Sequence, residues 1–195
     1  ALAWMSNWEY ANNVPTSQYR SANSVPRDLV LYTKNGQTYL SSTPSPEVLK
    51  LRGKAQKKGS FKVDRSHEVN PILSDHMGTY EIEIKFKNNG ADIMSFQLFN
   101  SKGEEVEMHY NLLDNTFTMD RRNSGATDFS KTFATATSAP ISAAKEYTLR
   151  LLVDNCSIEA FDGNGVFPEE PYNRISFNAK GGAFTVTSLT IYPFK

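Results

Sequence analysis

The stretch TYEIEIKFK (residues 79–87) decides the fold, because apolar and polar side chains alternate along its whole length. The apolar set is Tyr80, Ile82, Ile84 and Phe86, and the polar set is Glu81, Glu83, Lys85 and Lys87. Successive side chains of a β-strand point to opposite faces, so the pattern predicts a strand with one buried and one wet face. Such a strand is typical of an antiparallel sheet. The Asn-Asn-Gly turn at residues 88–90 predicts that the chain then reverses.

Similar short apolar segments follow at regular intervals. They are residues 92–100, 105–111, 116–120, 147–153, 157–161, 174–179 and 183–193. Turn signals rich in Asn, Asp and Gly separate them, a spacing typical of an all-β sandwich or barrel. Helical signal is confined to PEVLKLR (residues 46–52), where Pro46 occupies the first helical position and Ser45 is the expected cap.

The Ser- and Pro-rich run SSTPSP (residues 41–46) marks a break in the organisation of the chain. We expect residues 1–43 to hold two or three strands, residues 44–54 to form a linker with a short helix, and residues 55–195 to form a two-sheet sandwich. The first part is too small to close a core of its own. We therefore expect it to pack on the sandwich, on a partner, or on sequence outside this chain.

Composition excludes several classes of protein. Lys+Arg and Asp+Glu both number 21, whereas nucleic-acid-binding domains usually carry a basic excess. One cysteine can form neither an internal disulfide nor a cysteine-rich zinc site. No apolar run approaches the roughly 20 residues of a membrane span, and no signal peptide is visible. The sequence predicts no metal, no cofactor and no nucleic-acid partner.

The opening stretch AWMSNWEYANNVPTSQYRSANSVPRDL (residues 3–29) resembles the end of the catalytic domain in glycoside hydrolase family 32, the invertases, levanases and inulinases. The matching elements are Trp4-Met5-Ser6-Asn7-Trp8, Tyr10-Ala11, Val14-Pro15-Thr16, Arg20-Ser21-Ala22 and Val25-Pro26-Arg27-Asp28-Leu29. Residues 42–52 look like the family's linker, and MDRRNSG (119–125) and LLVDNCSIEAFDGNGVFP (151–168) look like signatures of its C-terminal sandwich. The resemblance implies an all-β chain in which remnant strands of the last blade of a five-bladed β-propeller precede a two-sheet antiparallel sandwich.

The resemblance also implies what this chain lacks. The family's nucleophilic aspartate lies in an Asn-Asp-Pro-like motif, its transition-state aspartate in Arg-Asp-Pro, and its acid/base glutamate in Glu-Cys. None is present: Leu29 follows Asp28, and Asn155 precedes Cys156, which replaces the family's usual serine. Asn23 also stands where a Met is common. Retaining glycosidases need two carboxyls about 5–5.5 Å apart, so we expect this chain alone to be inactive.

We therefore expect a C-terminal portion of a secreted bacterial β-fructosidase, an O-glycosyl hydrolase acting on levan, inulin or sucrose. It would reach its carbohydrate through the parent enzyme, in an extracytoplasmic location, and its partner would be the missing propeller domain. The alternative is a lectin-like module that holds fructan chains, which exposed Tyr or Trp on one sheet would support. A complete independent enzyme is opposed by the missing carboxylates.

Trp4 is the candidate substrate-binding residue. An aromatic ring can pack against the C–H face of a sugar, and the resemblance implies that Trp4 walls the pocket for a terminal fructose and that Trp8 packs. Composition alone favours core packing between blade and sandwich for both, and this alternative stays open.

The remaining candidates are better explained structurally. Glu159 and Asp162 could form a carboxylate pair, but a solvated or turn role is favoured for both. The histidines His67, His76 and His109 lack the spacing of a metal site. Residues 120–123 (Asp-Arg-Arg-Asn) could bind sugar hydroxyls, but we expect them to pin a turn or contact the propeller. We expect Cys156 to be a small buried residue, and the aromatic residues of 129–135 to be core.

Overall fold

A computed structural model describes residues 1–69, 78–142, 144–160, 164–165 and 172–195. Its strands pair in antiparallel fashion into three sheets. The helices of the described residues are two short 3-10 turns, η1 (Ala11–Asn13) and η2 (Pro46–Leu51). The expectation of an all-β chain with almost no helix is confirmed, and no helix in the described part of the chain has the length and apolarity to cross a membrane.

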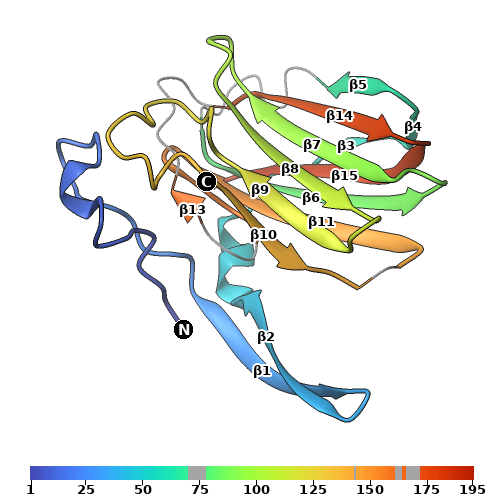
Figure 1. Cartoon of the computed structure of the whole chain (residues 1–195), viewed down its shortest axis with the longest axis horizontal. Coiled ribbons are helices and arrows are strands. Elements are labelled where there is room, and N and C mark those ends of the chain that lie inside the picture. Colours follow the sequence, from blue (N-terminus) through green and yellow to red (C-terminus); the bar gives the residue numbers. More distant parts are fainter. Residues whose placement is uncertain (70–77, 143, 161–163, 166–171) are drawn as a thin grey trace.

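Two of the sheets face each other as a sandwich (Figure 1). The six-stranded sheet has the order β10 (Ala136–Pro140), β9 (Thr116–Asp120), β8 (Glu105–Asn111), β7 (Ile93–Phe99), β14 (Arg174–Lys180) and β5 (Ser66–Val69). The seven-stranded sheet has the order β13 (Asn164–Gly165), β12 (Ser157–Glu159), β11 (Glu146–Asp154), β6 (Tyr80–Asn88), β15 (Phe184–Pro193) and β3 (Gln56–Lys58), and β4 (Phe61–Val63) also pairs with β15. The long strands coincide with the predicted ones to within one or two residues at either end. The short strands β3, β4, β5, β10 and β13 carry too weak a pattern to have been predicted.

Alternation along the long strands builds the core between the two sheets. On β6 the side chains of Ile82, Ile84 and Phe86 are fully buried, as the pattern of residues 79–87 predicts. The rings of Phe86 and Phe96 lie 4.9 Å apart across the sandwich, and Phe96 also contacts Phe177 on its own sheet at 5.7 Å. Tilted and edge-on aromatic pairs of this kind stabilise beyond their buried area.

Glu81 lies on the face of β6 that the pattern predicts to be exposed to solvent, but its side chain is buried. The side chain of Glu81 has no exposed surface, because the linker lies over this part of the seven-stranded sheet. Arg52, directly after η2, donates two hydrogen bonds to the Glu81 carboxylate, at 2.8 and 2.5 Å. Arg150 on the neighbouring strand β11 donates a third. The prediction that Glu81 is solvated is therefore wrong, and its burial anchors the linker.

The predicted helix at residues 46–52 is a 3-10 helix, and its predicted cap is wrong. Ser45 makes no capping hydrogen bond with its side chain. Its hydroxyl donates instead to the Asp28 carboxylate at 2.5 Å, which joins the start of η2 to β1. Local sequence favoured a cap because Ser precedes Pro46, but the tertiary partner takes the hydroxyl.

The first 44 residues lie beside the sandwich and form a hairpin and the segment that precedes it. Strands β1 (Arg27–Lys34) and β2 (Gln37–Pro44) pair with each other in a hairpin that extends away from the body of the molecule (Figure 1). Both strands carry exposed apolar side chains: Leu29, Val30, Leu31, Tyr32, Tyr39 and Leu40. Tyr10 and Val14, which precede the hairpin, are buried against Phe133 in a small second core.

Candidate functional site

Trp4 lies on a short strand-like segment that is held by main-chain pairing. Trp4 and Asn23 form an antiparallel bridge. On either side of it, Met5 N–H donates to the Ala22 carbonyl at 2.9 Å and Ser24 N–H donates to the Ala3 carbonyl at 2.8 Å. The position of the indole therefore depends on residues 22–27, because they hold the segment that carries it.

The two tryptophans contact each other at the surface. Their ring centroids are 4.9 Å apart with an interplanar angle of 58°. Trp4 is 41% exposed and Trp8 is 88% exposed, so the pair presents apolar ring faces that this chain does not cover. The packing that the sequence predicted for Trp8 is absent from the described residues, where Trp4 is its aromatic neighbour.

Glu159 on β12 holds the segment that pairs with Trp4. One carboxylate oxygen accepts the Val25 N–H at 2.7 Å, and the other accepts the Arg27 guanidinium at 2.8 Å. The Glu159 side chain is 5% exposed. The prediction of a solvated or turn role is therefore wrong, because its partners lie more than 130 residues away in the sequence and no local pattern reveals them. Asp162, the other half of the suspected pair, lies outside the described residues.

A second contact joins Tyr19, which precedes residues 22–27, to the turn between β11 and β12. A hydrogen bond between Tyr19 and the Cys156 thiol, reinforced by burial, raises the pKa of the Tyr19 hydroxyl to about 12. Cys156 is half-buried in this turn and not in a strand. Its predicted full burial is wrong, because the thiol faces the N-terminal segment and not the sandwich core.

Arg121 provides a third contact between the sandwich and the N-terminal part of the chain. Its Nε donates to the Phe133 carbonyl at 2.8 Å, its guanidinium carbon lies 4.1 Å from the centroid of the Phe133 ring, and a terminal nitrogen reaches the Tyr10 hydroxyl at 3.4 Å. The predicted structural role of residues 120–123 is confirmed for this residue. The core role of the aromatic residues of 129–135 is also confirmed, because Phe133 is buried and Phe129 packs on it.

Arg122 points to solvent and binds Asp120 at 2.5 Å. Hydrogen bonds from Arg122 outweigh partial burial and lower the pKa of the Asp120 carboxyl below its usual range. This pair, of which only Arg122 is exposed, closes the end of β9, as expected of residues that pin a turn.

The described residues show an exposed tryptophan pair, and among them no metal centre is found. Their buried carboxylates, Glu81 and Glu159, are both engaged by arginines, which leaves them unsuited to proton transfer. No group of three or more His, Cys, Asp or Glu side chains in this part of the chain could hold a metal. His67 stacks on Phe61 at 4.1 Å, His109 lies on the outer face of the six-stranded sheet, and His76 falls outside the described residues.

The hydroxyls of Ser6 and Ser21 are enclosed near the tryptophan segment but have no hydrogen-bond partner within the described chain. Buried hydroxyls are normally paired, so these two atoms are exceptions among the described residues. Ser21 also has φ of 69°, a conformation uncommon for a residue with a side chain.

Comparisons with known proteins agree with this architecture. Residues 47–193 match the model of the C-terminal domain of glycosyl hydrolases family 32, and residues 1–44 match the model of the N-terminal domain of the same family. The levanase of Bacillus subtilis is 32% identical over the whole chain. The extracellular exo-inulinase of Aspergillus niger is 27% identical over 93% of it.

Solved structures share the fold. The exo-inulinase of Aspergillus awamori superposes on the whole chain with a TM-score of 0.83 at 22% identity, and a fructofuranosidase of Schwanniomyces occidentalis in complex with fructose does so over 99% with a TM-score of 0.74 at 19% identity. The chain spans 30% of the B. subtilis levanase, 36% of the A. niger enzyme and 40% of the A. awamori chain. It belongs to glycosyl hydrolase family 32.

Proposed function

We propose that this chain is the C-terminal sandwich, with the closing strands of the catalytic propeller, of a glycosidase that cleaves β-fructosyl linkages in levan, inulin or sucrose. The observation that carries the proposal is the succession of the two family-model matches, N-terminal over residues 1–44 and C-terminal over 47–193. The proposed domains are a propeller remnant at 1–43, a linker at 44–54 and the sandwich at 55–195.

The exposed hairpin supports the assignment of residues 1–43 to a propeller blade. An isolated two-stranded hairpin is marginally stable in water, and a contiguous apolar surface on a soluble protein marks an interaction site. Leu31 and Leu40 lie opposite each other in the register of β1 and β2 and are 70% and 60% exposed. Further strands of the same blade would cover them.

The sandwich then has a mechanical role in the parent enzyme. Glu159, Cys156 and Arg121 bind the N-terminal segment, and Glu81 binds the linker through Arg52. These contacts would hold the propeller's last blade on the sandwich. The buried carboxylates of the described residues are both engaged by arginines, and the family's three catalytic motifs do not occur in the sequence, so the chain alone is inactive under this proposal.

Trp4 is proposed as one wall of the pocket for the terminal fructosyl unit. An exposed indole offers a flat apolar face to the C–H groups of a sugar, and the polar groups that orient the sugar would come from the rest of the propeller. We also propose an extracytoplasmic location in a bacterium, since curated relatives include enzymes named as extracellular.

Replacing Trp4 tests the pocket role in the parent enzyme. Loss of one buried aromatic face costs about 1.5–3 kcal/mol, so Trp4→Ala should lower kcat/KM for levan or sucrose by roughly 10- to 100-fold. Trp8→Ala provides the matched control and should have a much smaller effect. Equal effects of the two variants would contradict the special role of Trp4.

The proposed inactivity of the chain is tested by incubating the purified 195 residues with levan, inulin and sucrose and measuring released fructose. We expect none, whereas the parent enzyme purified in parallel should release fructose. Release that survives chromatography and scales with the chain would overturn the proposal.

A further inference from the structure

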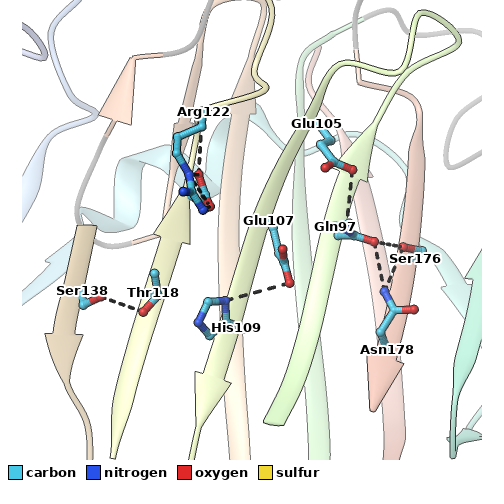
Figure 2. Close-up of polar contacts among 10 residues, drawn as sticks. Gln97, Glu105, Glu107, His109, Thr118, Arg122, Ser138, Ser176 and Asn178 are labelled. Atoms are coloured by element: carbon cyan, nitrogen blue, oxygen red, sulfur yellow. Dashed lines mark hydrogen bonds and ion pairs between the residues drawn. The ribbon is translucent and has the colours of Figure 1, made fainter. Parts of the chain in front are cut away.

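The outer face of the six-stranded sheet carries two rows of polar side chains, and Figure 2 shows most of their members. The strand register places Asn178, Ser95, His109, Thr118 and Ser138 side by side across β14, β7, β8, β9 and β10. A parallel row one step along the strands contains Ser176, Gln97, Glu107 and Asp120. Neighbouring strands are about 4.8 Å apart, so each row offers a hydrogen-bonding group at that interval.

A groove of about 330 Å³ lies over the centre of these rows. Its polar lining consists of Ser95, Glu107, His109 and Asn178, with Lys180 at one end. The short Ser95 side chain forms the low point between the longer His109 and Asn178, its opposite neighbours in the register. The volume lies at the lower end of the range of small-molecule sites.

Hydrogen bonds fix the second row beside the groove. Gln97 Oε1 accepts from Ser176 Oγ at 2.9 Å and from Asn178 Nδ2 at 3.0 Å, and Gln97 Nε2 donates to Glu105 at 3.5 Å. A connected network of this kind orients its members before a ligand arrives. Asn178 in particular is held with its Nδ2 group already engaged.

Three groups of the first row keep unused hydrogen-bonding capacity. Within the described residues, Ser95 Oγ, Asn178 Oδ1 and His109 Nε2 have no hydrogen-bond partner, and they face the same groove. His109 Nδ1 lies 4.0 Å from the Glu107 carboxylate. Of these groups the amide oxygen accepts, the hydroxyl donates and accepts, and the imidazole nitrogen does one or the other according to its tautomer.

The charge and polarity of the groove select the class of ligand. Glu107 and Lys180 offset each other, so the groove lacks the basic excess that phosphates and nucleic acids require. Ile93 and Ala179 add apolar surface beside the polar groups, a mixture that suits a sugar ring, whose C–H face is apolar and whose hydroxyls are polar. The hydroxyls of a neutral saccharide both donate and accept, so they can pair with each of the three unused groups.

We propose that this groove is a second carbohydrate site, distinct from the tryptophan pair, which binds a neutral oligosaccharide across β14, β7 and β8. The choice of a fructan as its ligand rests on the proposed function, whereas the saccharide chemistry rests on the groove alone. A shallow site contacts one side of a sugar, so we expect a Kd on the order of 1 mM. Such a site would keep the parent enzyme on a polymeric substrate between cleavages, by raising the effective concentration of chain ends.

The test is a titration of the isotope-labelled 195-residue chain followed by amide NMR shifts. Levantriose and nystose represent two fructan linkages, and maltotetraose is the non-fructan saccharide. With on the order of 10 mM ligand, we expect saturable shifts in β7, β8 and β14. His109→Ala and Asn178→Ala should each weaken binding by at least tenfold, and Asn155→Ala, an exposed asparagine at a turn of the other sheet, should leave it unchanged.

If no saccharide shifted the amides of β7, β8 and β14, the proposed groove site would be overturned. Equal saccharide affinity of the His109→Ala and Asn155→Ala variants would also overturn it. Shifts confined to Trp4 and Trp8 would also overturn it while leaving the proposed function intact. Shifts in the groove with maltotetraose and with neither fructan would support a saccharide site and contradict its assignment to fructans. The two proposals can therefore fail separately.

Discussion

Glu159 binds the Val25 N–H and the Arg27 guanidinium, which lie far away in the sequence. The burial of its carboxylate determines how much these contacts contribute to stability. Its carboxylate is 5% exposed, and the Arg27 side chain that it binds is 14% exposed. An exposed ion pair contributes little to stability, whereas removal of one partner from a buried pair leaves an uncompensated charge and costs about 3–5 kcal/mol. Glu159 therefore controls the position of residues 22–27, and through them of Trp4.

Glu159→Ala should loosen the N-terminal segment more than the sandwich. With a local loss of about 3 kcal/mol, amide exchange at Val25 should accelerate on the order of 100-fold, while amides of β6 should change little. Hydrogen-exchange mass spectrometry or NMR measures both. Glu146→Gln is the control, because Glu146 is 74% exposed and lies 3.7 Å from Lys87 at the surface. Unchanged exchange at Val25 would show that Glu159 does not hold this segment.

At the scale of elements, the linker helix η2 is attached to the sandwich by a buried charge cluster. Burial alone would raise the pKa of Glu81, but hydrogen bonds from Arg52 and Arg150 outweigh it and lower the pKa below its usual value. Arg52 also lies over the Tyr192 ring, 4.0 Å from its centroid. The linker thus has both an electrostatic and an aromatic contact with the seven-stranded sheet.

The lowered pKa predicts a pH dependence of stability. The unfolded glutamate titrates near pH 4.3, above the folded value, so the contribution of Glu81 is complete at neutral pH. It is lost as the pH falls, because the unfolded chain takes up the proton first. Glu81→Gln should be less stable than the native chain by about 3 kcal/mol at pH 7, and the difference should shrink between about pH 5 and pH 3.

Urea unfolding at a series of pH values measures this difference. Glu146→Gln serves again as the control and should follow the native chain at every pH, since Glu146 is exposed. A Glu81→Gln deficit that stays constant down to pH 3 would contradict the assigned role of the Glu81 charge.

The turns that connect β6 to β7 and β14 to β15, each of which leads from one sheet of the sandwich to the other, pack closely against each other. Ala183 accepts hydrogen bonds from Asn89 N–H at 3.0 Å and from Ala91 N–H at 3.2 Å. A Cβ atom at Gly182 would lie 2.1 Å from the Gly90 carbonyl oxygen. Glycine is required at position 182 because two backbones approach there.

Gly182→Ala should therefore destabilise the sandwich, at the upper end of the 1–3 kcal/mol typical of overpacking, about 3 kcal/mol. Gly59→Ala is the matched control, because no atom lies within 4 Å of a Cβ at that position. Thermal unfolding of the two variants measures the contrast. Equal melting temperatures of the Gly182→Ala and Gly59→Ala variants would show that the two turns can move apart without loss of stability.

At the scale of the whole molecule, the outer faces of the two sheets differ. The seven-stranded sheet receives the linker and the N-terminal segment through Glu81 and Glu159. The six-stranded sheet presents the polar rows of Figure 2. The hairpin β1–β2 projects from the first of these sides with apolar residues uncovered, so the molecule has a side suited to a protein partner and a side suited to water or sugar.

The uncovered hairpin should make the 195-residue chain self-associate. Replacing Leu31 and Leu40 together by Thr removes the most exposed cross-strand apolar pair, and the association measured by sedimentation should fall. Thermal unfolding of the sandwich should not change, because neither residue contacts its core. Leu113→Thr is the control: Leu113 is 73% exposed at a separate turn. If it reduced association equally, the hairpin would not be the associating surface.

The sequence by itself determined the sandwich strands and the family. Alternation over residues 79–87 and its later counterparts is a local property, since the side-chain direction in a strand reverses at every residue. Burial of Ile82, Ile84 and Phe86 followed from it directly. The motif order around Trp4 pointed to family 32 in the same way, because motifs are read along the chain.

Tertiary structure alone decided where the polar residues lie. Alternation placed Glu81 and Glu159 in water, but each is buried, because an arginine from another element neutralises its charge. Ser45 bonds to Asp28 instead of capping its own helix. The line of Asn178, Ser95 and His109 exists only in the register of three strands. A sequence pattern predicts on which side of a strand a side chain lies. The residue that it binds there comes from a part of the chain that is distant in sequence. Local sequence therefore does not reveal the binding partner.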